Sequence, residues 1–467
     1  MLLKRLVEFG ENRMEATPLG YDYRPVRWLI KLDKNGSLLG GPVSLPDSEG
    51  VGKGRGTRML LPDIPRSSNI EPKLLSDNGE YVLGLEKAAG GKQSAKVIER
   101  HSRFVSLIEQ CIAETSEHSI KAVLSFLHNT DYEKIMFPDD FDPGQDIAFE
   151  VNGIRPDSLP SIRAFWIAYL KEKLESDKLH QCNICGSKLP ALRIHPMKIK
   201  KVPQGQTSGN TIIAANAAAF ESYGLESSFI SPTCYSCAET YAKAANHLIA
   251  GDDTHITLGP VVYLFWTKEP GEWNPVGLLS RPDPDQVKAL FQSVRRGKEV
   301  QQEIRANEFY ATALSASGSR VAVRDWLETT IPQAKKKMAQ WFRWQHIVDA
   351  WTGEIGDPLP VRGYWHEKQY HVGLADHLAP LGKNKRRKVD DLPAQVFQTL
   401  MNSALTGMPL PDWLLAQAVR RNCAEQNVTY PRAALIKAIL HSQRNKKEVY
   451  MEYPDPNHPS SAYHCGR

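Results

Sequence analysis

The N-terminal part of the chain begins with the period of a strand. Apolar residues at every second position predict a half-buried strand: Val26, Trp28, Ile30 and Leu32. The step Asn35-Gly36 then favours a tight turn, and a return strand is expected to begin near Leu38. Together, residues 21–45 are predicted to form a hairpin. The stretch 46–72 is rich in Gly, Pro and Ser and is therefore expected to be a long loop.

Helical periodicity takes over after residue 92, with strands placed between the helices. The pattern predicts two helices within 92–129, a strand at 147–151, a turn at Asn152-Gly153 and a helix running on through Leu174. Further elements are expected as a helix over 232–249, a strand over 261–266, a strand pair at 309–314 and 320–323, and a helix from Asp325. Three last helices are predicted at about 394–406, 411–424 and 431–445. Mixed elements in this order predict an α+β fold.

Composition limits the class of protein without identifying it. The 467 residues are 41% hydrophobic and 24% charged, ordinary values for a globular chain long enough for two or three domains. A net charge of +5 is only mildly basic. No stretch approaches the roughly 20 apolar residues that span a bilayer, and charges interrupt the N-terminal segment, so we expect a cytoplasmic protein without membrane contact.

Four of the seven cysteines form two Cys-x-x-Cys pairs, Cys182/Cys185 and Cys234/Cys237. Two such turns supply the four thiolates of a tetrahedral structural zinc site. Gly186 follows the first pair, at a position that often needs a positive φ. The alternatives are reduced, packed cysteines or a redox pair, although one Cys-x-x-Cys would suffice for redox chemistry. We expect one structural zinc.

The segment between the cysteine pairs is basic over its first part. From Lys188 to Phe220 there is no Asp or Glu. Cationic and small polar side chains there include Lys198, Lys200, Lys201, Gln206 and Ser208. Such a loop suits phosphate and base-edge contacts, while a solvated basic loop is the plainer interpretation. A scaffold held by a metal favours nucleic acid.

Two further basic clusters lie elsewhere in the chain. Lys53, Arg55 and Arg58 precede Arg66 and Lys73 in the glycine-rich stretch. Lysines and arginines at 383 and 385–388 form a run in a polar linker. A run of this kind is usually solvated, or contacts a nucleic-acid backbone without specificity.

Motifs for common enzyme chemistry are missing. The chain contains no P-loop, no G-x-S-x-G elbow and no H-E-x-x-H. A zinc-stapled His-Asn-His nuclease is the one catalytic alternative, with His195 as general base. However, Ile194 precedes that histidine where an acidic residue is usual, and Ala238-Glu239-Thr240 follows Cys237 without the expected metal ligand. We therefore predict no enzymatic activity.

Four stretches, in order along the chain, resemble the large subunit of the type I-C CRISPR Cascade surveillance complex. They lie at 66–84, 194–224, 309–328 and 428–438, and the most specific is Ala219-Phe220-Glu221-Ser222-Tyr223-Gly224. Many members of that family lack the four cysteines. They also continue into a C-terminal helical bundle beyond the position matching Arg467. That bundle is absent, supplied by a separate chain or outside the given sequence, and separate small subunits are expected among the partners.

The resemblance implies a DNA-reading role within an RNA-guided complex. Such a subunit reads the protospacer-adjacent motif, helps to unwind the duplex, holds the displaced strand and recruits a helicase-nuclease, while guide RNA pairing reads the target. Implied partners are the RNA-bearing backbone and CRISPR RNA-processing subunits and double-stranded target DNA. Asn69, Lys73 and Asn78 match the family's loop and are expected near the flanking motif, with Ser68, Gln206 and Ser208 as further candidates. An Asx-type turn is the alternative for Asn69 and Asn78.

Three domains are expected from these observations. Residues 1–180 form an α+β DNA-recognition domain, 181–275 a zinc-binding insert with the basic loop, and 276–467 a mainly helical region that contacts partners. The candidate DNA-binding residues are Lys53, Arg55, Arg58, Ser68, Asn69, Lys73, Asn78, Lys198, Lys200, Lys201, Gln206 and Ser208.

Overall fold

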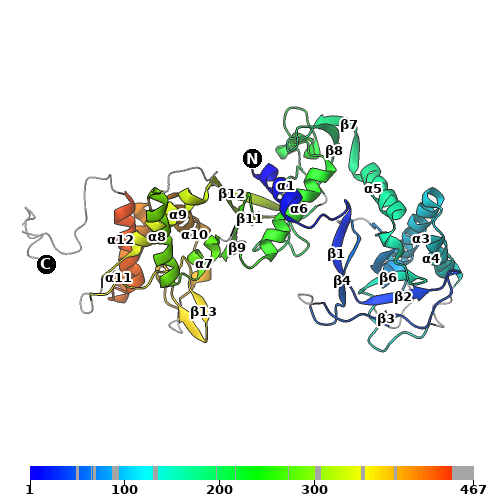
Figure 1. The fold of residues 1–467 in the computed structure, drawn as a ribbon, viewed down its shortest axis with the longest axis horizontal. Helices are drawn as coiled ribbons and strands as arrows, with labels where there is room; N and C mark the ends of the chain where they lie inside the picture. The colour runs from blue at the N-terminus through cyan, green and yellow to red at the C-terminus, as the bar shows by residue number, and fades with distance from the viewer. Residues whose placement is uncertain are drawn as a thin grey trace, which may run out of the picture. The chain divides into compact units, whose positions relative to one another are not determined.

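A computed structural model shows two compact units (Figure 1). It describes residues 1–48, 52–64, 66, 70–86, 94–129, 135–195, 197–215, 217–271, 273–299, 307–348, 353–382 and 387–443. The first unit is built mainly from Leu3–Lys198 and Ile213–Lys243, and the second from Ile199–Ile212 and the chain after Ala244. Helices and sheets occur in both units, which confirms the predicted α+β class. The predicted three-domain division stays a prediction.

The first unit is organised around a four-stranded mixed sheet of order β3-β2-β6-β5. Its strands are β2 (Trp28–Leu32), β3 (Val43–Ser44), β5 (Ser76–Asn78) and β6 (Asp146–Val151). β2 pairs antiparallel with β3 and parallel with β6, so the predicted return strand is confirmed. Gly36 adopts a φ of 89° in the turn between them, a conformation that favours glycine.

The predicted long loop is wrong over its centre. β4 (Thr57–Pro62) is a strand and pairs antiparallel with β1 (Tyr21–Val26), which the hairpin prediction had joined to the following strand. Leu61 is buried against Val26 and Leu29. The apolar residues of β4 are few and lie between Gly- and Pro-rich segments, which hid the strand's period.

Helices cover this sheet as the pattern predicted. α3 (Ala95–Thr115) and α4 (His118–Asn129) bury their apolar faces, and the ring of Phe126 meets Phe149 of β6 at 6.1 Å. α1 (Leu2–Arg13), α2 (Gly79–Val82) and α5 (Pro160–Leu174) complete the helices before the ribbon of β7 (Glu175–Gln181) and β8 (Lys188–Leu192). α6 (Tyr235–Ala250) begins directly after Cys234 and includes Cys237.

The second unit contains an antiparallel sheet of order β12-β11-β10-β9. Its strands are β9 (His255–Leu258), β10 (Val261–Thr267), β11 (Glu308–Ser317) and β12 (Arg320–Thr330). The helix predicted from Asp325 is wrong, because β12 continues to Thr330. Trp326 holds this part to the sheet, its ring 5.9 Å from Tyr310 and 5.7 Å from Trp266. The helix starts only at Ile331, where Pro332 fits a first turn.

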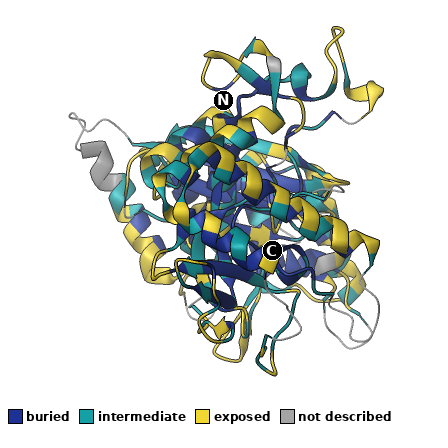
Figure 2. Ribbon diagram, turned by 90° about the vertical axis from the view of Figure 1, so that its right-hand side faces the viewer, coloured by how far each residue is buried: buried dark blue, intermediate teal, exposed yellow. Residues whose placement is uncertain are grey.

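One side of that sheet carries a helical core. The helices are α7 (Pro275–Ser280), α8 (Pro284–Glu299), α9 (Ile331–Gln345), α10 (Ala394–Thr406), α11 (Asp412–Glu425) and α12 (Tyr430–Gln443). A short hairpin of β13 (Tyr364–His366) and β14 (Gln369–His371) precedes the last three, which confirm the predicted C-terminal helices. Buried and exposed residues alternate along the helices (Figure 2). Among the described helices none is long and apolar enough to cross a membrane.

Candidate metal centre and nucleic-acid interface

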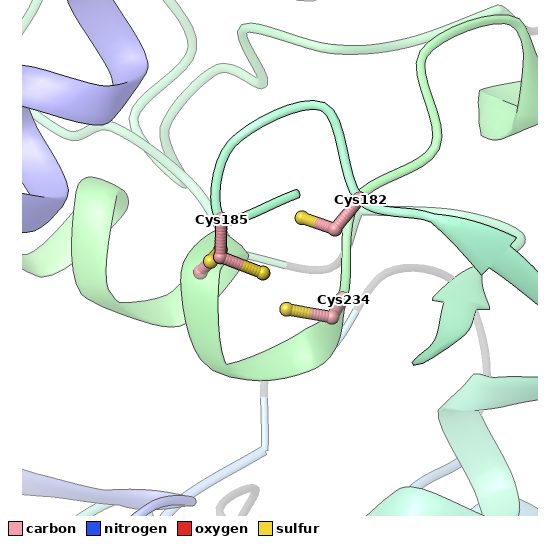
Figure 3. A group of neighbouring side chains, drawn as sticks. Cys182, Cys185 and Cys234 are labelled. Carbon is pink, nitrogen blue, oxygen red and sulfur yellow. The ribbon is translucent and has the colours of Figure 1, made fainter. Parts of the chain in front are cut away.

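The four predicted cysteines meet at one point of the first unit. Cys182 and Cys185 lie in the turn between β7 and β8, Cys234 precedes α6, and Cys237 lies in its first turn. The four sulfur atoms lie within 4.8 Å of one another. Figure 3 shows the thiols of Cys182, Cys185 and Cys234 converging. Cys185 is exposed and the other three are buried, so the cluster reaches the surface on one side.

The first cysteine turn has the backbone of a zinc knuckle. Gly186 donates to the carbonyl of Cys182 at 2.9 Å, and the Ile184 N–H points at the Cys182 sulfur at 3.5 Å. Gly186 has a φ of 77°, as the sequence predicted for this position. N–H groups directed at a sulfur favour its thiolate form, which is the form that binds a metal.

Backbone hydrogen bonds join the two cysteine turns. Asn183 N–H donates to the carbonyl of Pro232 at 2.9 Å, and Leu192 N–H donates to that of Thr233 at 3.0 Å. Residues more than forty positions apart in the sequence are thereby fixed side by side. The donor set is preorganised by the fold and does not depend on the sulfurs alone.

Neighbouring thiols in the cluster shift one another's pKa. The side-chain hydrogen bond with Cys237 lowers the pKa of Cys234 to about 5, and the same contact raises the pKa of Cys237. Burial raises the pKa of Cys182. Ideal tetrahedral Zn–S bonds of about 2.3 Å place sulfurs about 3.8 Å apart, so a small contraction of this cluster suffices. Four cysteines close together, in this environment, can bind a metal ion.

Glu239 ties the second cysteine turn to the N-terminal strand. Its carboxylate accepts from Gly20 N–H at 3.0 and 3.1 Å and pairs with Lys243 at 2.5 Å. Lys243 also donates to the carbonyl of Tyr21 at 2.6 Å. Burial raises the pKa of Glu239. In the sequence Glu239 was noted only because it stands where a metal ligand is expected, and its contact with Gly20, 219 residues away, has no local sequence signal.

The second half of the basic loop is attached to the second unit. Residues 199 and 210 pair as an antiparallel bridge, and Thr211 bridges to Arg320 of β12. The Asn210 side chain is buried, where it accepts from Gln206 N–H at 3.0 Å and donates to the carbonyl of Gly318 at 2.8 Å. Residues 199–211 therefore form a closed loop with a fixed base.

The candidate side chains of this loop face solvent. Lys200, Lys201, Gln206 and Ser208 are exposed, and Lys198 is half-buried. Lys201 has a φ of 58°, and Lys200 N–H donates to the Asn246 side chain at 2.7 Å. The backbone is thus held while the charged ends remain accessible.

The N-terminal basic cluster sits on a turn held by one carboxylate. Asp47 accepts from the N–H groups of Gly54 and Gly56, both at 2.7 Å, and these contacts lower its pKa. Lys53 and Arg55 are exposed on this turn. Arg58 lies on β4 with its guanidinium 5.1 Å from the Tyr23 ring.

Lys73 is engaged inside the first unit. Its ammonium lies 2.7 Å from Asp63, and burial lowers its pKa. Arg24, itself buried, contacts the same carboxylate and donates to Asp146 at 2.6 Å. Asp77 is 1% exposed, accepts from Lys73 N–H at 3.0 Å and pairs with Arg66. No sequence pattern predicts this ion network, because its members are far apart in the chain.

Asn78 caps a helix, as the Asx-type alternative anticipated. Its side-chain oxygen accepts from Tyr81 N–H at 3.3 Å at the start of α2. Ser68 and Asn69 lie outside the described residues. Of the basic run in the later linker, 383–386 lie outside them as well, and Arg387 makes a two-point ion pair with Glu425 at 3.1 and 2.9 Å.

His195, the general base of the nuclease alternative, is buried. It is 2% exposed, and its Nδ1 lies 2.9 Å from the Tyr241 hydroxyl. Burial lowers its pKa to about 4. A phosphodiester in solution does not reach an imidazole in this position.

A known family model matches nearly the whole chain. The family model described as CRISPR-associated protein (Cas_Csd1) matches residues 3–467. A comparison with curated proteins found no match.

Proposed function

Because the chain belongs to the Cas_Csd1 family of CRISPR-associated proteins, we propose that it is the DNA-binding large subunit of a type I-C Cascade complex. In this role it recognises the protospacer-adjacent motif, helps to unwind the duplex and recruits the helicase-nuclease in antiviral defence. Its partners are the backbone and CRISPR RNA-processing subunits, separate small subunits and target DNA, all in the cytoplasm. The family match along residues 3–467 carries this proposal.

The accessible cations support contact with DNA. Lys200 and Lys201 are exposed on a loop whose base is hydrogen-bonded, and Lys53 and Arg55 are exposed on a turn fixed by Asp47. Rigid loops hold their charges in place without an ordering cost at binding. We assign phosphate contacts to these residues, Arg58 and Lys198, and base-edge contacts to Gln206 and Ser208.

The flanking-motif reader is placed in the segment around Ser68 and Asn69. The chain on both sides is anchored, by Arg66 on Asp77 and by Lys73 on Asp63. Lys73 and Asn78 then act by shaping this segment, which refines the direct contact expected from their sequence position. A protein that delegates target reading to guide RNA needs only a short reader of the flanking motif.

The metal of the cysteine cluster is proposed to be one structural zinc. Four sulfur ligands complete a tetrahedral shell and leave no open position for a substrate. Bound zinc would hold the β7–β8 ribbon against α6. Glu239 of α6 would in turn fix Gly20, next to the start of β1, through its hydrogen bond. This role involves no catalysis.

The nuclease alternative is disfavoured by the burial of His195 and its contact with Tyr241. Magnesium-dependent cutting of duplex DNA by the purified chain, lost in His195→Ala, would support the nuclease instead. Our proposal predicts no cutting above the buffer background, with or without magnesium or zinc.

The direct test of the proposed role omits this subunit from the reconstituted complex. Complexes with and without the chain would be titrated with target duplexes that carry or lack a permissive flanking motif. Guide-dependent binding that needs both the chain and the motif is the expected result. Equal binding by the complex without the chain would overturn the proposal.

A further inference from the structure

The loop at 217–226 exposes more apolar surface than folding of the first unit accounts for. Tyr223 is 98% exposed, and Phe220 and Leu225 are 45% and 37% exposed. Ala217, Ala218 and Ala219 are exposed as well. Isolated exposed side chains need no explanation, but a group of exposed apolar side chains within one short loop favours an interaction site.

Tyr223 occupies a turn position that disfavours it. Leu225 N–H donates to the carbonyl of Ser222 at 3.0 Å, and the two central residues have positive φ, 55° at Tyr223 and 69° at Gly224. This is the pattern of a type I′ turn, in which Asn-Gly is the preferred pair. The left-handed backbone conformation of Tyr223 costs free energy. Packing of its ring within the first unit does not offset this cost, because the ring is almost fully exposed.

The base of the loop is firmly held. Glu221 accepts from Ser227 N–H at 2.7 Å, and Ser228 N–H donates to the carbonyl of Arg193 at 3.1 Å. The Phe229 ring stacks on His180 of β7 at 5.0 Å. A rigid base keeps the ring of Tyr223 outside, as an anchor residue of an interface requires.

The charges around the loop at 217–226 indicate which class of macromolecule binds it. From Val202 to Ala242 the chain has no Lys, Arg or His, while Glu221 and Glu226 lie in the loop itself. A nucleic acid would meet two carboxylates on this loop, whose own residues carry no cation, in contrast to the basic segment at 188–201. A protein surface with an apolar pocket and a basic rim complements both the ring and the acids.

We propose that the turn Ser222–Leu225 docks Tyr223 into an apolar, basic-rimmed pocket of another protein subunit of the RNA-guided complex. This inference rests on the proposed function, because that function supplies the partner. The side chain enters the pocket, Phe220 and Leu225 cover its edge, and Glu226 faces the basic rim. Anchor residues of this type dominate the affinity of an interface.

The test uses the full chain and a guide-RNA-loaded subcomplex of the remaining subunits. Tyr223→Asn keeps the turn, because Asn-Gly suits a type I′ turn. Its melting temperature should equal or exceed that of the wild type, while its affinity for the subcomplex falls by about 30-fold. Tyr223→Phe should retain affinity, and Glu226→Lys should slow association. Trp365→Ala, which removes an exposed aromatic side chain on β13, is the matched control and should change nothing.

Each contrary outcome identifies its cause. Failure of the wild-type chain to join the subcomplex would overturn the proposed function itself. Normal joining by wild type and Tyr223→Asn alike would overturn this inference and leave the proposed function standing. Unchanged assembly with weakened DNA binding would identify a nucleobase as the occupant, and self-association of the isolated chain that disappears in Tyr223→Asn would identify a second copy. Both results would overturn the inference.

Discussion

The ammonium group of Lys73 lies 2.7 Å from a carboxylate oxygen of Asp63, so a residue that the family resemblance assigns to a DNA-contacting loop pairs with an acid of its own unit. The same carboxylate neighbours the buried guanidinium of Arg24, whose Nη2 donates to the carbonyl of Ser76 at 3.0 Å. A residue with the sequence position of a DNA contact is thus committed to an internal ion pair. Its removal should first affect folding.

Lys73→Ala should destabilise the chain by about 2 kcal/mol, because it leaves the half-buried carboxylate of Asp63 with one partner fewer. Denaturant unfolding measures this. The exposed Lys53→Ala is the control and should stay within about 0.5 kcal/mol of the wild type. Unchanged stability in Lys73→Ala, together with loss of flanking-motif preference, would restore the direct-contact interpretation.

Two roles of Asn78, capping of helix α2 and recognition of the flanking motif, can be tested separately. Asn78→Ala should cost about 1 kcal/mol, because Tyr81 N–H loses its acceptor. Asn78→Ser keeps an acceptor at the helix start and should restore most of this stability. If Asn78→Ser binds DNA with the wild-type flanking preference, the residue acts as a cap. Loss of the preference at wild-type stability would make it a reader.

Cys234→Ser should remove the metal and lower the melting temperature, because binding energy at a structural site is largely folding energy. Elemental analysis should give about one zinc per wild-type chain, as four thiolates bind one ion. Cys423→Ser replaces a free, exposed cysteine and is the control. A wild-type chain without metal, or a Cys234→Ser chain with unchanged melting, would contradict a structural site.

The basic loop should act through phosphates. Changing Lys198, Lys200 and Lys201 together to Gln should weaken DNA binding by the complex equally for all flanking sequences. The slope of log K against log salt should fall by up to about 2.7, because each phosphate that is no longer neutralised by a lysine reduces it by about 0.9. The matched control changes the exposed Lys4, Lys34 and Lys121. An unchanged slope in the loop variant would remove the loop from the DNA interface.

Glu425 should make the second unit sensitive to acid. Hydrogen bonds from Arg387, and then from Arg432, lower its pKa from 4.5 to about 2. A lowered folded-state pKa means that the unfolded chain takes up the proton first, so the stabilisation is complete above pH 4.5 and disappears as pH falls toward 2. Glu425→Gln should flatten the dependence of the melting temperature on pH in that window.

The same substitution should also destabilise the chain at neutral pH. Arg432 is fully buried, and the amide leaves its charge without a counterion. A melting temperature of Glu425→Gln equal to the wild type at pH 7, or the same acid sensitivity, would show that the Glu425 ion pairs do not stabilise the second unit.

Sequence patterns correctly predicted the elements whose apolar residues recur at helix or strand spacing and are buried in the structure. The helices at 95–115 and 118–129 and the turn at Asn35-Gly36 are examples. The pairing of β1 with β4 was missed, because it depends on a partner about thirty-five residues away in a Gly-rich stretch. Trp326 was assigned to a helix, since a contact with Tyr310 across the sheet leaves no local trace.

The candidate sites divide in the same way. The Cys-x-x-Cys spacing of the two cysteine pairs is visible in the sequence and predicts a metal site, and the four sulfur atoms do lie close together. Whether a single Lys or Asn is available to a ligand depends on distant groups. Lys73 and Asn78 are engaged by Asp63 and by Tyr81 N–H, whereas Lys200 and Lys201 remain accessible.

The proposed function requires that this chain read a short flanking motif for an RNA-guided complex. The decisive measurement is the selection of bound duplexes by the assembled complex from a target library with randomised flanking bases. We predict an enriched motif of two or three base pairs that disappears in Ser68→Ala/Asn69→Ala and persists, with weaker binding overall, in the triple lysine variant. Guide-dependent binding with no flanking preference in the wild-type complex would refute this role.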